Sequence, residues 1–229
     1  MAAGGLAALV VVATISGALY QGMASSRDRD RYPPPGELVA VAGHRLHLYC
    51  VGAGEPTVVL EAGAGGSWLD WSLVQDSVAT FASVCAYDRR GFGWSDPIDV
   101  PQRSSQVAEA LFILLEAAGV EGPLVLVGHS LGGIYVRRFA ERYQATVAGM
   151  VLVESSHENQ GRRLPADVAD LDPGLTRLLA ICRVAAPLGL MRLMNVAAGF
   201  TAVSGLRRGA NTMCTGIDPG SSLTPLDTW

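Results

Sequence analysis

The chain has 229 residues, of which 49% are hydrophobic and 17% charged, and its formal net charge is −4. This length is enough for one domain with a full hydrophobic core. The weakly acidic balance lacks the basic surface that nucleic acid requires, so we expect no nucleic-acid partner. The four cysteines, Cys50, Cys85, Cys182 and Cys214, show no metal-ligand spacing, and neither a metal nor a cofactor is predicted. Cys50 and Cys85 fall in apolar, strand-like runs and are interpreted as free buried thiols.

The first 26 residues carry no charge, and residues 2–23 are almost all apolar or small. As a helix these residues would reach about 33 Å, enough to cross a bilayer. We therefore predict a single-pass N-terminal membrane anchor over residues 1–26. A cleaved signal peptide with a site near residues 22–24, followed by secretion, is the alternative, although the positive n-region is missing. A buried core helix is a third interpretation. Arginines at 27, 29 and 31 place the following domain in the cytoplasm by the positive-inside rule.

Residues 27–36 contain three consecutive prolines, at 33–35, and are predicted to form a stiff linker. A hairpin is expected next, with His44 and His47 as exposed residues of its arms. Beyond it, apolar runs alternate with segments of helical periodicity, which is typical of a mostly parallel sheet covered on both faces. The expected strands are 37–42, 45–51, 57–60, 83–87, 123–127 and 147–153, and the expected helices are 70–80, 105–118 and 130–143.

The motif Gly128-His129-Ser130-Leu131-Gly132 lies between an apolar run and an amphipathic segment. A strand, a sharp turn and a helix form the context in which this Gly-x-Ser-x-Gly motif presents a nucleophilic serine. The glycines let strand and helix approach closely. The Leu131 amide would then face an oxyanion formed at Ser130. The alternative is a glycine-rich turn with an inert serine.

Three segments together resemble the α/β-hydrolase superfamily, in particular serine hydrolases of the AB hydrolase-1 type. These segments are residues 57–68, 88–95 and 128–132, and the likeness covers about residues 35–159. The resemblance implies an α/β-hydrolase fold in which Ser130 is the nucleophile and the amides of Leu131 and Ala64 are the oxyanion donors. It also implies a small-molecule ester or other acyl substrate. Family members often have His-Gly where this chain has Ala62-Gly63.

The family's acid and histidine normally follow its last two strands, but no strand-like run follows Glu154 here. The chain is therefore predicted to lack those two strands and to be truncated at its C-terminal end. His157 is the only histidine beyond Ser130, so it is a substitute base, with Glu154 as a substitute acid. Alternatively, His157 is a polar loop residue. The expected division is anchor 1–26, linker 27–36, hydrolase core 37–160, partial helical cap 161–205 and irregular tail 206–229.

Two functions follow from this pattern. The first is a membrane-anchored serine hydrolase with an esterase-like activity on an acyl substrate. The second is a truncated or non-catalytic hydrolase-like domain that at most binds acyl ligands. Without an acid and a base, only binding and the oxyanion hole would remain, which give roughly 10³–10⁴-fold acceleration over water.

Overall fold

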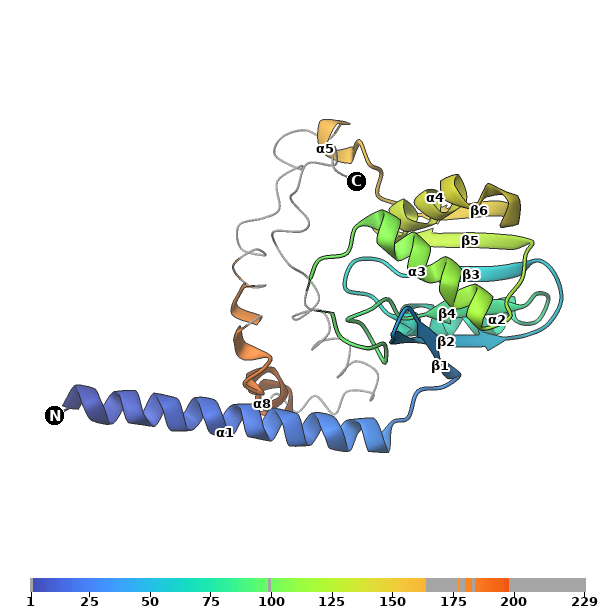
Figure 1. Cartoon of the computed structure of the whole chain (residues 1–229). Helices are drawn as coiled ribbons and strands as arrows, with labels where there is room; N and C mark the ends of the chain where they lie inside the picture. Colours follow the sequence, from blue (N-terminus) through green and yellow to red (C-terminus); the bar gives the residue numbers. More distant parts are fainter. Residues whose placement is uncertain (1, 99, 164–176, 178–179, 183, 198–229) are drawn as a thin grey trace. The chain divides into compact units, whose positions relative to one another are not determined.

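The structure is a computed structural model that describes residues 2–98, 100–163, 177, 180–182 and 184–197. The described residues fall into two compact units, one that contains residues 2–33, 177, 180–182 and 184–197 and one that contains residues 34–98 and 100–163. Within the second unit, the described part is a sheet with its covering helices (Figure 1). The predicted cap (161–205) falls partly, and the predicted tail (206–229) entirely, outside the described residues.

The sheet has six strands in the order β1-β2-β4-β3-β5-β6 among the described residues (Figure 1). β1 and β2 form the predicted hairpin, β2 pairs antiparallel with β4, and the remaining neighbours are parallel. Beyond β6 the described residues add no strand to the sheet, and the predicted loss of the family's last two strands stays a prediction, because most residues after 163 lie outside the described part. The strands are β1 (Glu37–Val41), β2 (His44–Val51), β3 (Thr57–Glu61), β4 (Val84–Tyr87), β5 (Leu124–His129) and β6 (Val147–Val153).

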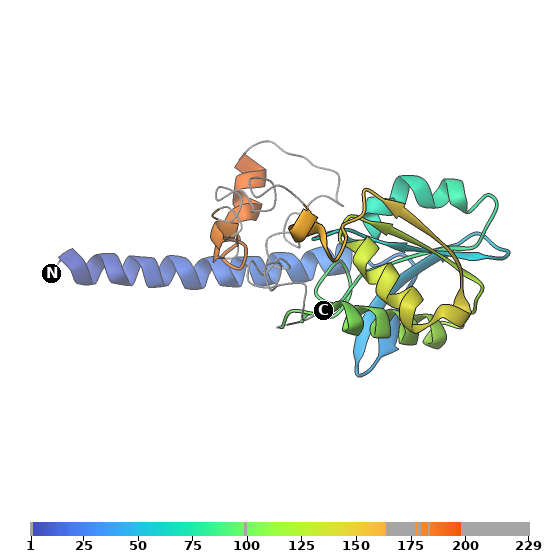
Figure 2. The ribbon, with the colours of Figure 1, turned by 90° about the horizontal axis from the view of Figure 1, so that it is seen from above.

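Helices cover both faces of this sheet, as Figure 2 shows from above. On one face, α3 and α4 bury Leu111, Leu114 and Phe139 against strand residues such as Val59 and Leu126. On the other face, Trp71 packs with residues of β3 and β4 near the start of α2. The predicted doubly wound, mostly parallel α/β fold is confirmed. The helices of this unit are η1 (Trp68–Trp71), α2 (Ser72–Val78), α3 (Ser104–Ala117), α4 (Gly132–Arg142), η2 (Gln144–Thr146) and α5 (Gln160–Arg163).

The first unit contains α1 (Ala2–Arg31) and α8 (Leu190–Ala197). From Gly4 to Arg31, α1 is long and apolar enough to cross a membrane, with a mean hydropathy of 1.7 and none of its apolar window buried. It continues through residues 27–31, which we assigned to the linker, because the proline that stops a helix comes only at Pro33. Asp28, near the end of α1, forms an ion pair with Arg192 of α8 at 2.6 Å.

Two predictions about β2 are wrong. Cys50 and Cys85 are not free thiols, because they form a disulfide between β2 and β4, where they are register partners. His47 is not exposed, because its side chain is completely buried. Both errors come from long-range contacts: β4 is the sheet neighbour of β2 and brings Cys85 opposite Cys50, whereas the rings of Trp68 and Trp94 cover His47 at centroid distances of 5.9 and 5.1 Å.

Candidate active site

The proposed nucleophile lies at a sharp bend between β5 and α4. Ser130 has a φ of +51°, a left-handed conformation that non-glycine residues rarely adopt. Its amide donates to the Val153 carbonyl at 3.0 Å, and its carbonyl accepts from the amides of Gly133 at 3.0 Å and Ser156 at 2.9 Å. These bonds hold the bend from both sides, and the serine remains partly exposed.

The glycines of the motif lie where a side chain would collide with the backbone. A Cβ on Gly128 would lie 2.8 Å from the Gly133 amide, and a Cβ on Gly132 would lie 2.5 Å from the Glu61 carbonyl oxygen. Gly133 is equally restricted, because its Cβ would overlap the Ser155 hydroxyl. The residue types at the bend are therefore required by the close approach of β3, β5 and α4.

The loop after β3 lies against this bend. A Cβ on Gly63 would be 3.2 Å from the Ser130 Cβ and 3.0 Å from the His129 Nδ1. Among the described residues, the amides of Ala64 and Leu131 have no hydrogen-bond acceptor. One of these amides belongs to the residue after Ser130 and the other to the loop that lies against it, and amides without acceptors beside a serine are suited to binding an oxyanion.

Directly beneath this loop is a buried polar network that the sequence analysis missed. Arg89 forms an ion pair with Glu61 and donates to the carbonyls of Ala62 at 2.7 Å and Gly63 at 2.6 Å. The Tyr87 hydroxyl donates to the other oxygen of Glu61. Glu61 is completely buried and Arg89 nearly so. A charged residue at the end of an apolar strand was the only sequence signal for this network.

Burial raises the pKa of Glu61, and the charge of Arg89 with hydrogen bonds from Tyr87 and Arg89 opposes this effect in part. The pKa of Tyr87 is raised well above its usual value, by burial and by the neighbouring Glu61 charge. Asp70, beside Gly66 of the loop, also has a raised pKa because of desolvation and the Asp88 charge, although the Ser67 amide and the charges of His129 and Arg89 lower it. Groups of three or more His, Cys, Asp or Glu able to hold a metal are absent from the described residues.

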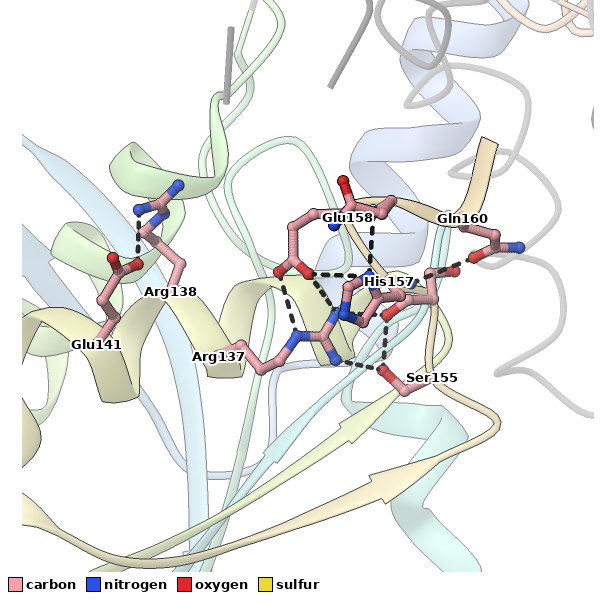
Figure 3. A network of polar contacts seen from close by, with 9 residues as sticks. Arg137, Arg138, Glu141, Ser155, His157, Glu158 and Gln160 are labelled. Atoms are coloured by element: carbon pink, nitrogen blue, oxygen red, sulfur yellow. Dashed lines mark hydrogen bonds and ion pairs between the residues drawn. The ribbon is translucent and has the colours of Figure 1, made fainter. Parts of the chain in front are cut away.

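His157 and Glu154 lie on the segment after β6. His157 is held by its own neighbours, because its Nδ1 accepts from the Asn159 amide at 3.0 Å and its side chain is half exposed (Figure 3). Glu154 is exposed and has a φ of +43°. Within the described part of the chain, neither side chain hydrogen-bonds to Ser130, and their roles as base and acid stay predictions.

Arg137 of α4 fixes this segment. Its guanidinium donates to both oxygens of Glu158 at 3.1 and 3.2 Å, to the Ser155 hydroxyl at 3.1 Å and to the Ser156 carbonyl at 2.6 Å (Figure 3). Burial raises the pKa of Glu158, but the hydrogen bond and charge of Arg137, the backbone amide and His157 outweigh it and hold that pKa below its usual value.

A second buried network joins β2 to the loop after β4. Nδ1 of His47 lies 2.8 Å from Asp88, and its Nε2 lies 2.6 Å from the Pro35 carbonyl oxygen. Asp88 also accepts from the amides of Trp68 at 2.8 Å and Trp94 at 3.0 Å. This network fixes the loop 88–96 and the start of η1 behind the site.

Residues 56–177 match the family model for the alpha/beta hydrolase fold. An uncharacterized Schizosaccharomyces pombe protein is 31% identical over 192 residues, which are 70% of this chain and 35% of that protein. An uncharacterized vacuolar membrane protein of Saccharomyces cerevisiae is 30% identical over 140 residues, 52% of this chain and 21% of that protein. A 2-hydroxymuconate semialdehyde hydrolase from Pseudomonas is 32% identical over 127 residues, 54% of this chain and 44% of that enzyme.

Solved structures agree on the fold. A meta-cleavage product hydrolase from Pseudomonas fluorescens superposes with a TM-score of 0.55 at 23% identity, over 83% of this chain and 69% of that one. A haloalkane dehalogenase from Agrobacterium tumefaciens superposes with a TM-score of 0.58 at 18% identity, over 79% of this chain and 66% of that one. This chain spans only 21–35% of the length of the first curated relatives. Because the family model covers more than half of the residues, the chain belongs to the α/β-hydrolase fold family.

Proposed function

We propose that this chain is a serine hydrolase of the α/β-hydrolase type, in which Ser130 attacks the carbonyl of an ester or other acyl substrate. The observation that supports the proposal is the left-handed bend at Ser130, which is followed by the acceptor-free amide of Leu131 and lies against the loop that contains Ala64. The family itself is a hydrolase fold, which makes a small-molecule substrate the expected partner. In this scheme the two amides stabilise the oxyanion of the tetrahedral intermediate, and the N-terminal end of α4 adds a favourable dipole.

The scheme also requires a group that accepts the proton of the Ser130 hydroxyl. His157 with Glu154 is our proposed base and acid, and the pair must rotate toward Ser130 to act, since His157 is bonded to the Asn159 amide instead. That observation favours a second candidate function, a non-catalytic hydrolase-like domain that binds acyl ligands without turnover. The two functions differ in whether the Ser130 hydroxyl reacts at an accelerated rate.

A fluorophosphonate probe tests the reactivity of Ser130 directly. We expect the full chain in detergent to be labelled, and we expect Ser130→Ala to abolish labelling. Ser155→Ala is the matched control, because this neighbouring hydroxyl is already bonded to Arg137 and should not react. Labelling of the parent no faster than of Ser130→Ala would overturn the serine-hydrolase proposal, and retained binding of a fatty-acid ligand in that case would support the second function.

Turnover is tested separately with a short-chain p-nitrophenyl ester. If His157 is the base, His157→Ala should reduce hydrolysis about 100-fold or more. His44→Ala, a surface histidine in β2, is the control and should have no effect. Undiminished hydrolysis by His157→Ala would exclude it as the base without affecting the role of Ser130.

We also propose that α1 anchors the domain in a membrane. The length and hydropathy of α1 support this, and the similarity to a vacuolar membrane protein points the same way. A chain with α1 intact should stay in the pellet after carbonate extraction, whereas a chain without residues 1–26 should be released. Release of the intact chain would contradict the anchor, and a shortened mature protein would identify a signal peptide.

A further inference from the structure

Arg89 binds two backbone carbonyls of the loop that contains Ala64, the proposed oxyanion donor. The Arg89 guanidinium donates to the Ala62 carbonyl at 2.7 Å and to the Gly63 carbonyl at 2.6 Å. The Gly63 carbonyl also accepts from the Gly66 amide at 3.2 Å, which closes the turn. Arg89 therefore fixes the backbone of this loop at two successive peptide units.

Because a peptide unit is planar, the contact of Arg89 with the Gly63 carbonyl also sets the direction of the Ala64 N–H. A trans peptide is planar, with its C=O and N–H pointing in opposite directions. The Gly63 carbonyl and the Ala64 amide belong to the same unit, so a carbonyl held by Arg89 directs the Ala64 N–H to the opposite side. Gly63 lies against Ser130, and a Cβ there would be 3.2 Å from the Ser130 Cβ. The peptide unit that contains the Ala64 N–H therefore adjoins the serine.

Arg89 is itself immobilised. Glu61 neutralises its charge, and the Tyr87 hydroxyl fixes the other carboxylate oxygen. The guanidinium lies 5.0 Å from the ring centre of Phe92 and 5.2 Å from that of Tyr135. Because Arg89 is only 5% exposed, it cannot act as a binding group for an anionic substrate from solvent.

We propose that the buried Arg89–Glu61 pair is a positioning device that orients the Ala64 amide toward the oxyanion at Ser130. Arg89 and Glu61 are positioning residues, because neither reaches the reacting atoms. This inference rests on the proposed serine-hydrolase function and adds the residues that set its second oxyanion donor. Glu61 is also the register partner of Gly128, so the device is attached to the strand that ends at the nucleophile.

The test must separate positioning from stability, since removing one member of a buried ion pair leaves an uncompensated charge. The double variant Glu61→Leu/Arg89→Met removes both charges and keeps the volume, a change that is often neutral for folding. We expect this variant to keep the melting temperature of the parent. Its maximal rate of fluorophosphonate labelling should fall about 100-fold, as expected for a lost oxyanion donor, while the concentration for half-maximal labelling stays unchanged.

Two comparisons make the result specific. Leu114→Ala creates a cavity in the core of α3, away from the loop, and should lower the melting temperature without slowing the labelling of folded protein. Arg89→Lys keeps a positive charge beside Glu61 but cannot bind Glu61 and two carbonyls together, so it should label as slowly as the double variant. Arg89→Lys decides the test if the double variant does not fold.

Hydrogen exchange supplies a readout that needs no reaction. The Gly66 amide, which closes the turn on the Gly63 carbonyl, should exchange faster in both Arg89 variants and at the parental rate in Leu114→Ala. A labelled parent with equally fast labelling of both Arg89 variants would overturn the positioning role alone. No labelling of the parent would overturn the proposed function and this inference together.

Discussion

The amide of Ser130 donates to the carbonyl of Val153 at 3.0 Å, which ties the bend after β5 to the end of β6. The return bond, from the Ser156 amide to the Ser130 carbonyl at 2.9 Å, fixes the segment that follows β6 beside the serine. Ser130 is thus held by backbone contacts with a segment whose conformation depends on Arg137 and Glu158. The properties of that segment can be changed without touching the serine.

Acidification should weaken this segment. The pKa of Glu158 is held below its usual value, so the ionised form stabilises the folded state. This contribution is present above the ordinary pKa of glutamate and is lost as the pH falls through the lower pKa of the folded state. We therefore expect the free energy of unfolding, measured with urea, to fall more in the parent than in Glu158→Gln between about pH 6 and about pH 3. Equal losses in the two proteins would contradict the prediction.

Gly63→Ala should impair the reaction more than the fold. The new methyl group would lie 3.2 Å from the Ser130 Cβ and 3.0 Å from the His129 Nδ1, so loop and serine must move apart. We expect labelling of Ser130 to slow by about tenfold to a hundredfold. Gly149→Ala is the matched control, since its nearest neighbour is 3.9 Å away. Parental labelling of Gly63→Ala would show that the loop does not act on Ser130.

His47→Leu should destabilise the domain strongly. Asp88 would keep the amides of Trp68 and Trp94 but lose the buried His47 ring, and a buried polar group that loses a hydrogen-bond partner costs about 1–3 kcal/mol. Denaturant unfolding of the full chain in detergent measures the loss. Arg45→Ala removes an exposed ion pair with Asp96 from the same strand and should cost far less. A similar loss in both variants would show that the His47–Asp88 pair makes no special contribution.

The Cys50–Cys85 disulfide leads to predictions about the free energy of unfolding and about the compartment of the domain. It closes a loop with a sequence separation of 35 residues, which corresponds to about 4 kcal/mol in the chain-entropy model. Reduction, or Cys50→Ala/Cys85→Ala, should lower the free energy of unfolding by up to that amount. Disulfides persist in oxidising compartments, so the bond favours the side of the membrane opposite to that indicated by the arginines.

Thiol alkylation in intact cells tests whether Cys50 and Cys85 are joined in a disulfide. Cys50 is exposed at its position in β2, so a reduced Cys50 would react readily with a maleimide. In a chain carrying Cys182→Ser and Cys214→Ser, we expect labelling only after reductant is added. Labelling without reductant would place the domain in a reducing compartment and contradict the disulfide.

Local sequence was sufficient to predict the elements of the fold and the bend at Ser130. Apolar runs of strand length and helical periodicity depend on neighbours in the chain, and the strands and helices of the core lie close to their expected bounds. The glycines around Ser130 are likewise a local signal, since the close approach they permit involves consecutive elements. The membership of the family followed from three such local segments.

Long-range pairing decided the rest. The pairing of Cys50 with Cys85, the burial of His47 and the Arg89–Glu61 pair all depend on contacts between segments distant in the chain, and the alternation along one strand does not reveal this. His157 illustrates the same limit: its place after β6 follows from the chain, but its side chain is held by the Asn159 amide. The sequence by itself determined that a serine would lie at a strand–helix bend. Only the tertiary structure decided which buried charges support the loop beside it, because partners distant in the chain meet only once the sheet has formed.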